Sequence, residues 1–118
     1  MEFVAPLEPI DIGLIKFQKG EYSKAVESLE RHLRAVPADS SDRNSTVLLL
    51  LAMSYAHLER TEDAIRYFAE GYDAYLREGL GPKRDSWSTP FLTYYAEVLR
   101  VNGQHAKADE VMRAISVS

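Results

Sequence analysis

The chain has 118 residues, of which 46% are hydrophobic and 27% charged, proportions typical of one soluble globular domain rather than of a disordered or collagen-like chain. Its formal net charge of −4, with 14 basic and 18 acidic residues, disfavours binding to nucleic acid or anionic lipid. The absence of cysteine excludes disulfides, thiol nucleophiles and zinc sites that need a thiolate.

The start of the chain and its apolar runs give no sign of a targeting or membrane segment. Glu2 stands where a secretory signal needs positive charge, and Pro6 interrupts a short apolar stretch. The longest uninterrupted apolar run, residues 47–53, is far shorter than the roughly 20 residues that span a bilayer. We therefore expect a cytoplasmic protein without membrane insertion.

Apolar residues at helical spacing divide the chain into six predicted helices, and no alternating strand pattern is evident. Gly20 ends the first helix and Pro37 follows the second, because both residues interrupt helical structure. A polar loop over residues 38–44 precedes the third helix. Asn44 begins a glycosylation sequon there, and we interpret it as a helix cap because no secretory signal is present. The predicted helices span residues 9–19, 21–36, 45–60, 61–78, 90–101 and 104–116.

The fourth and fifth helices have start signals of their own. Thr61 is followed by the acidic Glu62, which suits the positive end of a helix dipole. Pro90 suits the first turn of the fifth helix, with Ser88 or Thr89 as the predicted cap.

Three alanines at corresponding positions indicate that the six helices form three pairs. Ala25, Ala64 and Ala108 each lie in the opening turn of the second helix of a pair, and they are 39 and 44 residues apart. Twelve residues before each alanine is another small residue, and four residues after it is a larger apolar one. The small residues would let the two helices of a pair approach closely. The residues at these positions are Gly13, Ala52 and Ala96 before the alanine, and Leu29, Phe68 and Met112 after it.

This pattern resembles the tetratricopeptide repeat (TPR) over roughly residues 6–118. The first unit departs from the motif at Lys16, where a large apolar residue is usual, and at His32, where a small one is usual. The stretch between the second and third units resembles the longer repeat variant of kinesin light chains and bacterial multi-repeat proteins. The matching residues are Gly13, Gly20, Tyr22, Ala25 and Pro37 in the first unit, Leu51, Ala52, Tyr55, Ala64, Phe68 and Gly71 in the second, and Ala96, Gly103 and Ala108 in the third.

The resemblance implies an all-α fold in which three helix-turn-helix units stack as a right-handed superhelical solenoid. We expect a single domain over residues 1–118, with an extended N-terminal segment over 1–8. The expected units span residues 6–39, 45–80 and 88–118.

In a TPR stack, the first helices of the units line a concave groove that holds ligands. Carried over residue by residue, the groove is apolar over its first two units and polar over the third, which suits an apolar or amphipathic peptide. Two alternatives stay open: these residues are ordinary core, or the apolar N-terminal residues Met1, Phe3 and Val4 cover them rather than fraying. The predicted groove residues are Ile10, Leu14, Phe17, Leu49, Met53, His57, Thr93, Glu97 and Arg100.

Some TPR domains grip the C-terminal carboxylate of a partner with paired Lys, Asn and Arg side chains in the groove. The matching positions here hold neither a basic residue nor Asn, which excludes a carboxylate-clamp co-chaperone. These positions are Ile10, Leu14, Leu50, Thr93 and Glu97.

The chain has no motif for catalysis or for binding a metal or cofactor. His32, His57 and His105 belong to different units, and no HExxH, GxSxG or P-loop pattern occurs. Carboxylates such as Glu30, with the basic Arg34 four residues on, are typical of solvated helix faces. We therefore expect no enzymatic activity, no cofactor and no metal.

The sequence thus predicts a non-enzymatic protein-interaction module that binds an apolar or amphipathic peptide segment of a protein partner, and no nucleic acid. Two alternatives remain. The chain is a homo-oligomeric scaffold, a homodimer being its simplest form, or it is an adaptor domain of a larger protein.

Overall fold

The computed structural model describes residues 9–37, 44–78 and 88–116, and the regular structure in these ranges is entirely helical. The six predicted helices are all present, with ends that differ from the expected ones by at most three residues. The helices are α1 (Pro9–Gln18), α2 (Tyr22–Arg34), α3 (Ser45–His57), α4 (Thr61–Glu78), α5 (Ser88–Val101) and α6 (His105–Ser116).

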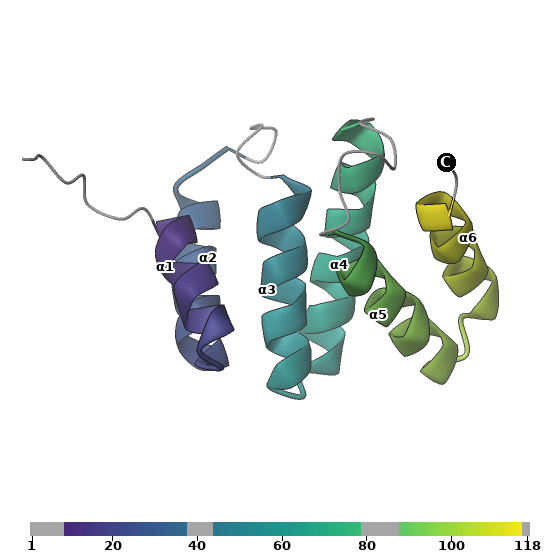
Figure 1. Ribbon diagram of the computed structural model, residues 1–118, viewed down its shortest axis with the longest axis horizontal. Helices are drawn as coiled ribbons and strands as arrows, with labels where there is room; N and C mark the ends of the chain where they lie inside the picture. The colour runs from purple at the N-terminus through teal and green to yellow at the C-terminus, as the bar shows by residue number, and fades with distance from the viewer. Residues whose placement is uncertain (1–8, 38–43, 79–87, 117–118) are drawn as a thin grey trace, which may run out of the picture.

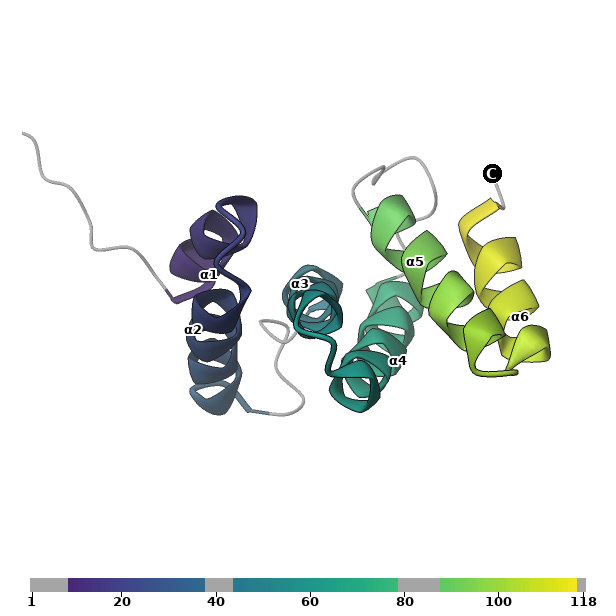
Figure 2. The same ribbon diagram turned by 90° about the horizontal axis from the view of Figure 1, so that it is seen from below.

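The helices are arranged as three neighbouring pairs, α1 with α2, α3 with α4 and α5 with α6, and these pairs have the most extensive contacts (Figure 1). We call them the first, second and third units. Helix α3 also contacts α1, α2 and α5, so it lies at the centre of the described structure. Figure 2 shows α1, α3 and α5 towards the upper side of the molecule, and α2 and α4 towards the lower side.

Each unit makes the same turn between its two helices. Gly20 and Gly103 have φ angles of 80° and 79°, and Glu59 has a φ of 61° at the corresponding place in the second unit. In each turn the N–H of the following residue donates to a carbonyl five residues back, which closes the first helix. These bonds join Glu21 N to Lys16 O at 2.9 Å, Arg60 N to Tyr55 O at 3.0 Å, and Gln104 N to Leu99 O at 2.8 Å. The repeated geometry confirms the alignment of the three units.

Two glycines allow close approach between helices. A Cβ atom on Gly13 would lie 2.6 Å from Cγ and Cδ2 of Leu29, so α1 and α2 could not keep their spacing with a larger residue there. A Cβ atom on Gly71 of α4 would lie 2.7 Å from Cδ2 of Leu49 in α3. The predicted role of the small residues is therefore confirmed at Gly13, and Gly71 allows a second close approach between paired helices.

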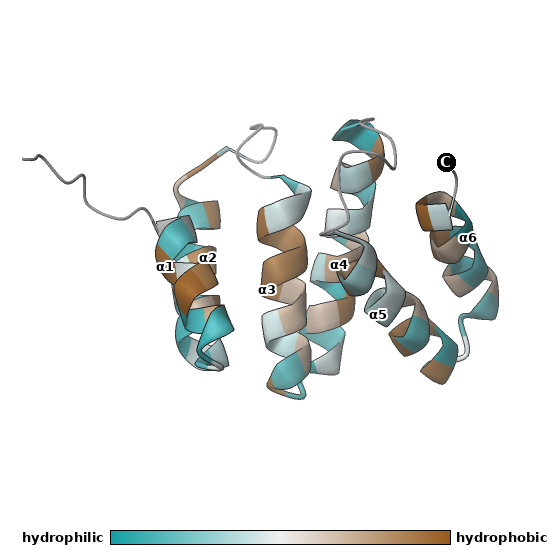
Figure 3. Ribbon diagram, viewed as in Figure 1, coloured by the Kyte–Doolittle hydropathy of each residue, from teal (hydrophilic) through white to brown (hydrophobic). Residues whose placement is uncertain are grey.

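Helix α3 supplies the middle of the hydrophobic core. Nine of its 13 residues are buried, and its central turns are apolar around most of the helix (Figure 3). Leu48, Leu49 and Leu51 have no exposed surface. Because α3 is surrounded by helices of all three units, its residues connect the units into one core.

Two polar contacts fix the start of α3. The side chain of Asn44 accepts a hydrogen bond from Val47 N at 3.1 Å, which confirms the interpretation of Asn44 as a cap. The carboxylate of Glu78, the last residue of α4, accepts from Ser45 N at 2.9 Å and from Ser45 Oγ at 2.8 Å. The end of α4 is thereby joined to the beginning of α3, where an anion is favoured by the helix dipole.

The predicted cap of α5 is wrong. The helix begins at Ser88, so Ser88 and Thr89 are its first two helical residues and Pro90 is its third. The first N–H groups of a helix have no intrahelical acceptor, so Pro90 removes no hydrogen bond there. Pro90 therefore lies in the first turn of α5, as predicted. Its position did not reveal which residue begins the helix.

Aromatic side chains join the second and third units. The ring of Phe68 in α4 stacks on Tyr95 in α5 with centroids 5.3 Å apart, and Tyr94 lies 6.1 Å from the same ring. Tyr72 lies 6.3 Å from Tyr95, and the ammonium of Lys107 in α6 sits 5.0 Å above the Tyr72 ring. These contacts make Phe68 and its neighbours the main connection between α4 and the third unit.

A hydrogen bond joins the first and second units. The hydroxyl of Tyr55 in α3 donates to the carboxylate of Glu30 in α2. The charge spacing predicts that Glu30 lies on a solvated helix face, but it is partly buried at the junction between units. The spacing of charges along α2 could not reveal this contact, because its donor comes from another helix.

Candidate functional site

Aromatic rings from four helices meet on the side of the molecule formed by α1, α3 and α5. The ring of Phe17 lies 5.5 Å from Tyr22, 6.1 Å from His57 and 6.2 Å from Phe91, measured between centroids. The imidazole of His57 stacks on Tyr22 at 4.1 Å with nearly parallel planes. We call Phe17, Tyr22, His57 and Phe91 the aromatic cluster. It brings residues of all three units into one place.

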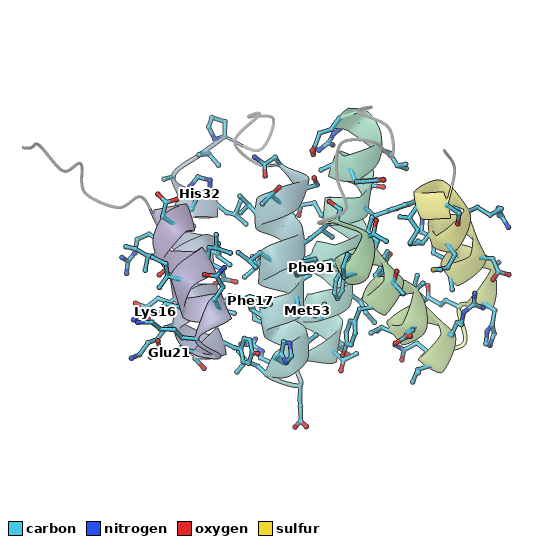
Figure 4. All side chains as sticks on the ribbon, viewed as in Figure 1. Lys16, Phe17, Glu21, His32, Met53 and Phe91 are labelled. Atoms are coloured by element: carbon cyan, nitrogen blue, oxygen red, sulfur yellow. The ribbon has the colours of Figure 1, made fainter. Side chains whose placement is uncertain are left out.

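The contact between Phe17 and Phe91 connects the two outer units across α3. Figure 4 shows Phe17, Met53 and Phe91 in the space between α1, α3 and α5. Both phenylalanines are half-buried and pack against the core, as does Met53. The predicted groove face is therefore apolar here, and the rings of Phe17 and Phe91 are in contact across it.

The contacts of Lys16 explain why the first unit can have a lysine where the repeat pattern usually has a large apolar residue. Its ammonium lies 3.5 Å from the carboxylate of Glu21, and Lys24 contacts the same carboxylate at 3.3 Å. The hydrogen bond from Lys24, with the charge of Lys16, holds the pKa of Glu21 below its usual value. A lysine is tolerated at this position because its charge reaches a partner at the edge of the unit (Figure 4).

The structure brings part of the predicted groove together. Phe17 and His57 are in the aromatic cluster, and Met53 lies beside them on α3. Leu14 is 38% exposed on α1, one helical turn before Phe17. Ile10 lies in the first turn of α1, but its side chain is outside the described part of the structure.

Leu49 is a correction to the predicted groove. Its side chain is fully buried and is directed at Gly71 of α4, so it belongs to the core and not to an open face. The run of apolar residues in α3 gives no contrast between its faces, and sequence reasoning therefore could not place Leu49 correctly.

None of the polar residues predicted for the third unit belongs to the aromatic cluster. Thr93 is half-buried and donates its hydroxyl to the carbonyl of Thr89 at 2.8 Å. Arg100 contacts the carboxylate of Asp109 in α6 at 2.7 Å. Glu97 is exposed and lines a different surface, a cleft next to α4.

This second surface is a cleft of about 380 Å³ between the start of α4 and the end of α5, which we call the α4–α5 cleft. In Figure 1, α5 diverges from α4 towards its C-terminal end. Of the lining side chains, Tyr94 is 38% exposed and Val101 is 86% exposed. The cleft is lined by Thr61, Tyr94, Glu97, Val98, Val101 and Asn102.

Two residues of these surfaces were missed in the sequence. Phe91 is not among the predicted groove residues, and Tyr22 is predicted only as a residue of the repeat motif. The signal for both was their aromatic character, but contact between distant helices cannot be deduced from spacing alone.

Three buried tyrosines at the junctions between units have raised pKa values. Burial is the main cause at Tyr55, where the hydrogen bond to Glu30 adds to it. Burial, together with the charge of Glu110, raises the pKa of Tyr72 to about 12. Burial also raises the pKa of Tyr95, with the charge of Asp73 as the next cause. These hydroxyls therefore keep their protons in the folded chain to a pH above the usual tyrosine pKa of 10.0.

These shifts predict that the protein unfolds in base. Between pH 10 and pH 12 the unfolded chain loses tyrosine protons that the folded chain retains, so the free energy of unfolding falls as pH rises. We expect tyrosinate absorbance and loss of far-ultraviolet circular dichroism to appear together in this range. The variant Tyr72→Phe should make the fall with pH shallower, whereas Tyr94→Phe at an exposed position should not. Complete ionisation of the tyrosines before any loss of helix would contradict the prediction.

The described residues hold no group of three or more His, Asp or Glu side chains placed to bind a metal ion. None of the helices in residues 9–37, 44–78 and 88–116 combines the length and the apolar character needed to cross a membrane.

Comparison with known proteins identifies the repeats. A sequence model of the family described as tetratricopeptide repeat matches residues 9–78, which are α1 to α4. No curated protein and no solved structure shows significant similarity to the chain. The likeness to the longer repeat variant of kinesin light chains depends in part on residues 79–87, which lie outside the described residues.

Proposed function

Because the chain belongs to the tetratricopeptide repeat family, whose repeats generally mediate protein–protein interactions, we propose that it binds an apolar or amphipathic peptide segment on the face formed by α1, α3 and α5. The observation that supports this proposal is the aromatic cluster, in which rings from all three units meet on that face. Half-buried aromatic side chains are typical anchors of protein interfaces, because they bring a large contact area with few rotatable bonds.

The exposed residues beside the aromatic cluster define how a peptide would be held. Leu14 offers apolar surface on α1, and Met53 offers a flexible side chain that adapts to different partners. The stacked ring of His57 presents polar nitrogen atoms at the edge of the same face. Since the rings of Phe17 and Phe91 contact each other across α3, the segment would lie on the outer surface of these rings and not between them and α3.

A matched pair of variants tests this face. Leu14 and Ile15 are consecutive residues of α1 with the same exposure of 38%, and they point in directions about 100° apart. We expect peptides selected from a displayed random library on the wild-type protein to bind Leu14→Glu roughly tenfold more weakly, and Ile15→Glu almost unchanged. Binding would be measured by fluorescence anisotropy, with circular dichroism to check folding.

Equal loss of affinity in both variants would contradict the proposal, because it would show a general effect on α1. Unchanged affinity in a folded Leu14→Glu protein would contradict it directly. Met53→Ala gives a second measurement on α3, and it should weaken the same peptides as Leu14→Glu does.

One observation favours self-assembly as a second function. Ile15 of α1 is an exposed apolar residue, with 38% of its surface accessible. Helix α1 is at one end of the row of helices in Figure 1, so this residue could join two copies through their first units. Light scattering over a wide concentration range tests this function, since assembly requires a mass that rises above 13.4 kDa.

A further inference from the structure

The α4–α5 cleft combines an apolar lining with one carboxylate. Tyr94, Val98 and Val101 lie on α5 and line the cleft, together with Thr61 at the start of α4. Val101 is the most exposed large apolar residue in the described part of the chain. Glu97 lines the same cleft, so an apolar group that entered it would lie close to a negative charge.

The positive charges nearest in sequence to this cleft are already engaged. Arg100 contacts Asp109 at 2.7 Å, on the side of α5 that faces α6. Arg60 contacts Asp63 at 2.7 Å, and its guanidinium lies 5.0 Å from the centre of the Tyr55 ring. Neither arginine neutralises Glu97.

The part of the cleft's rim that the structure describes is therefore acidic. Glu97 is exposed and has no ion pair with another described residue. Glu59 and Glu62, on either side of Thr61, are also exposed. A ligand of this cleft thus has to supply both an apolar side chain and positive charge.

We propose that the α4–α5 cleft binds a basic amphipathic segment of a partner protein. One apolar side chain of the segment enters the cleft between Tyr94, Val98 and Val101, and a neighbouring Lys or Arg pairs with Glu97. A second copy of this chain is a poor occupant, because its own net charge is −4 and like charges would be brought together. The inference rests on the proposed role in protein binding, but it concerns a surface distinct from the aromatic cluster.

Three capped peptides of equal length test the proposed chemistry. One contains Lys-Leu-Lys at its centre, the second contains Glu-Leu-Glu, and the third contains Lys-Gly-Lys. Each would be titrated into the isotope-labelled full chain and followed by shifts of the backbone amide signals, which detect weak binding. We expect saturable shifts at Tyr94, Val98, Val101 and Asn102 with Lys-Leu-Lys, and little response to the other two peptides.

Reversal of one charge gives the decisive comparison. In Glu97→Lys the Lys-Leu-Lys peptide should bind roughly tenfold more weakly and the Glu-Leu-Glu peptide should gain affinity, because attraction and repulsion are exchanged. Glu27→Lys, on the exposed surface of α2, is the matched control and should leave both affinities unchanged. Binding should also weaken as salt is added.

Each other outcome would overturn the inference. If Glu-Leu-Glu bound as tightly as Lys-Leu-Lys, charge would not determine binding. If Lys-Gly-Lys bound as tightly as Lys-Leu-Lys, no apolar side chain would be needed in the cleft. Shifts at Leu14 and Met53 in place of the cleft would refute this site while supporting the face formed by α1, α3 and α5. No shift at all would refute the cleft alone, because the library peptides and Leu14→Glu test the proposed function independently.

Discussion

Phe68→Ala is expected to lower the free energy of unfolding by about 3–5 kcal/mol, a large part of the stability of a domain of this size. The side chain of Phe68 has no exposed surface, and its ring contacts Tyr94 and Tyr95 of the third unit. Truncation therefore removes buried apolar surface and leaves a cavity between the second and third units. Urea unfolding followed by circular dichroism measures the loss.

Leu76→Ala is the matched control for this variant, since Leu76 lies on the same helix and is 50% exposed. It should change the stability by less than about 1 kcal/mol. Similar losses in both variants would contradict the prediction, because the half-exposed Leu76 has no buried contacts comparable with those of Phe68. A Phe68→Ala protein that does not fold at all can be replaced by Phe68→Leu, with the same order of effects.

Glu78→Ala is expected to lower the free energy of unfolding by about 2–3 kcal/mol, because two donors lose a charged acceptor. Those donors are the N–H and the hydroxyl of Ser45, a residue only 1% exposed. The effect arises mainly from leaving polar groups buried without a partner. The measurement is again urea unfolding, with Asp73→Ala as the control at an exposed acidic position of α4.

A double-mutant cycle separates this contact from other effects of Glu78. Ser45→Ala removes the hydroxyl donor and keeps the N–H donor, so the two substitutions together should cost less than the sum of the single losses. Strict additivity would mean that the Ser45 hydroxyl and Glu78 do not stabilise the fold through each other.

The sequence was sufficient for the helices and their pairing. Each unit has two small residues 12 positions apart, such as Gly13 and Ala25 in the first unit. A spacing that is repeated in three units is a stronger signal than any single helix boundary. The structure confirms the register through the turns at Gly20, Glu59 and Gly103. Only local details failed, such as the start of α5 at Ser88.

The candidate site was less predictable, because it depends on contacts between helices. The repeat pattern placed Phe17 and His57 on one face, and the ring contact between them agrees with that placement. It could not show that Leu49 is buried in a helix that is apolar on nearly every side. Nor could it show that Arg100 pairs with Asp109, so that Glu97 has no ion pair with another described residue.

The burial of α3 has a consequence for attempts to divide the protein into smaller pieces. Each unit looks like a separate module in the sequence, but α3 is covered jointly by α1, α2, α4 and α5. A fragment made of the second unit alone would expose to water the sides of α3 that contact α1, α2 and α5, and it would tend to aggregate. The smallest fragment that keeps α3 buried therefore contains parts of all three units. The second unit, whose repeat pattern is the easiest to recognise, is the unit least able to fold alone.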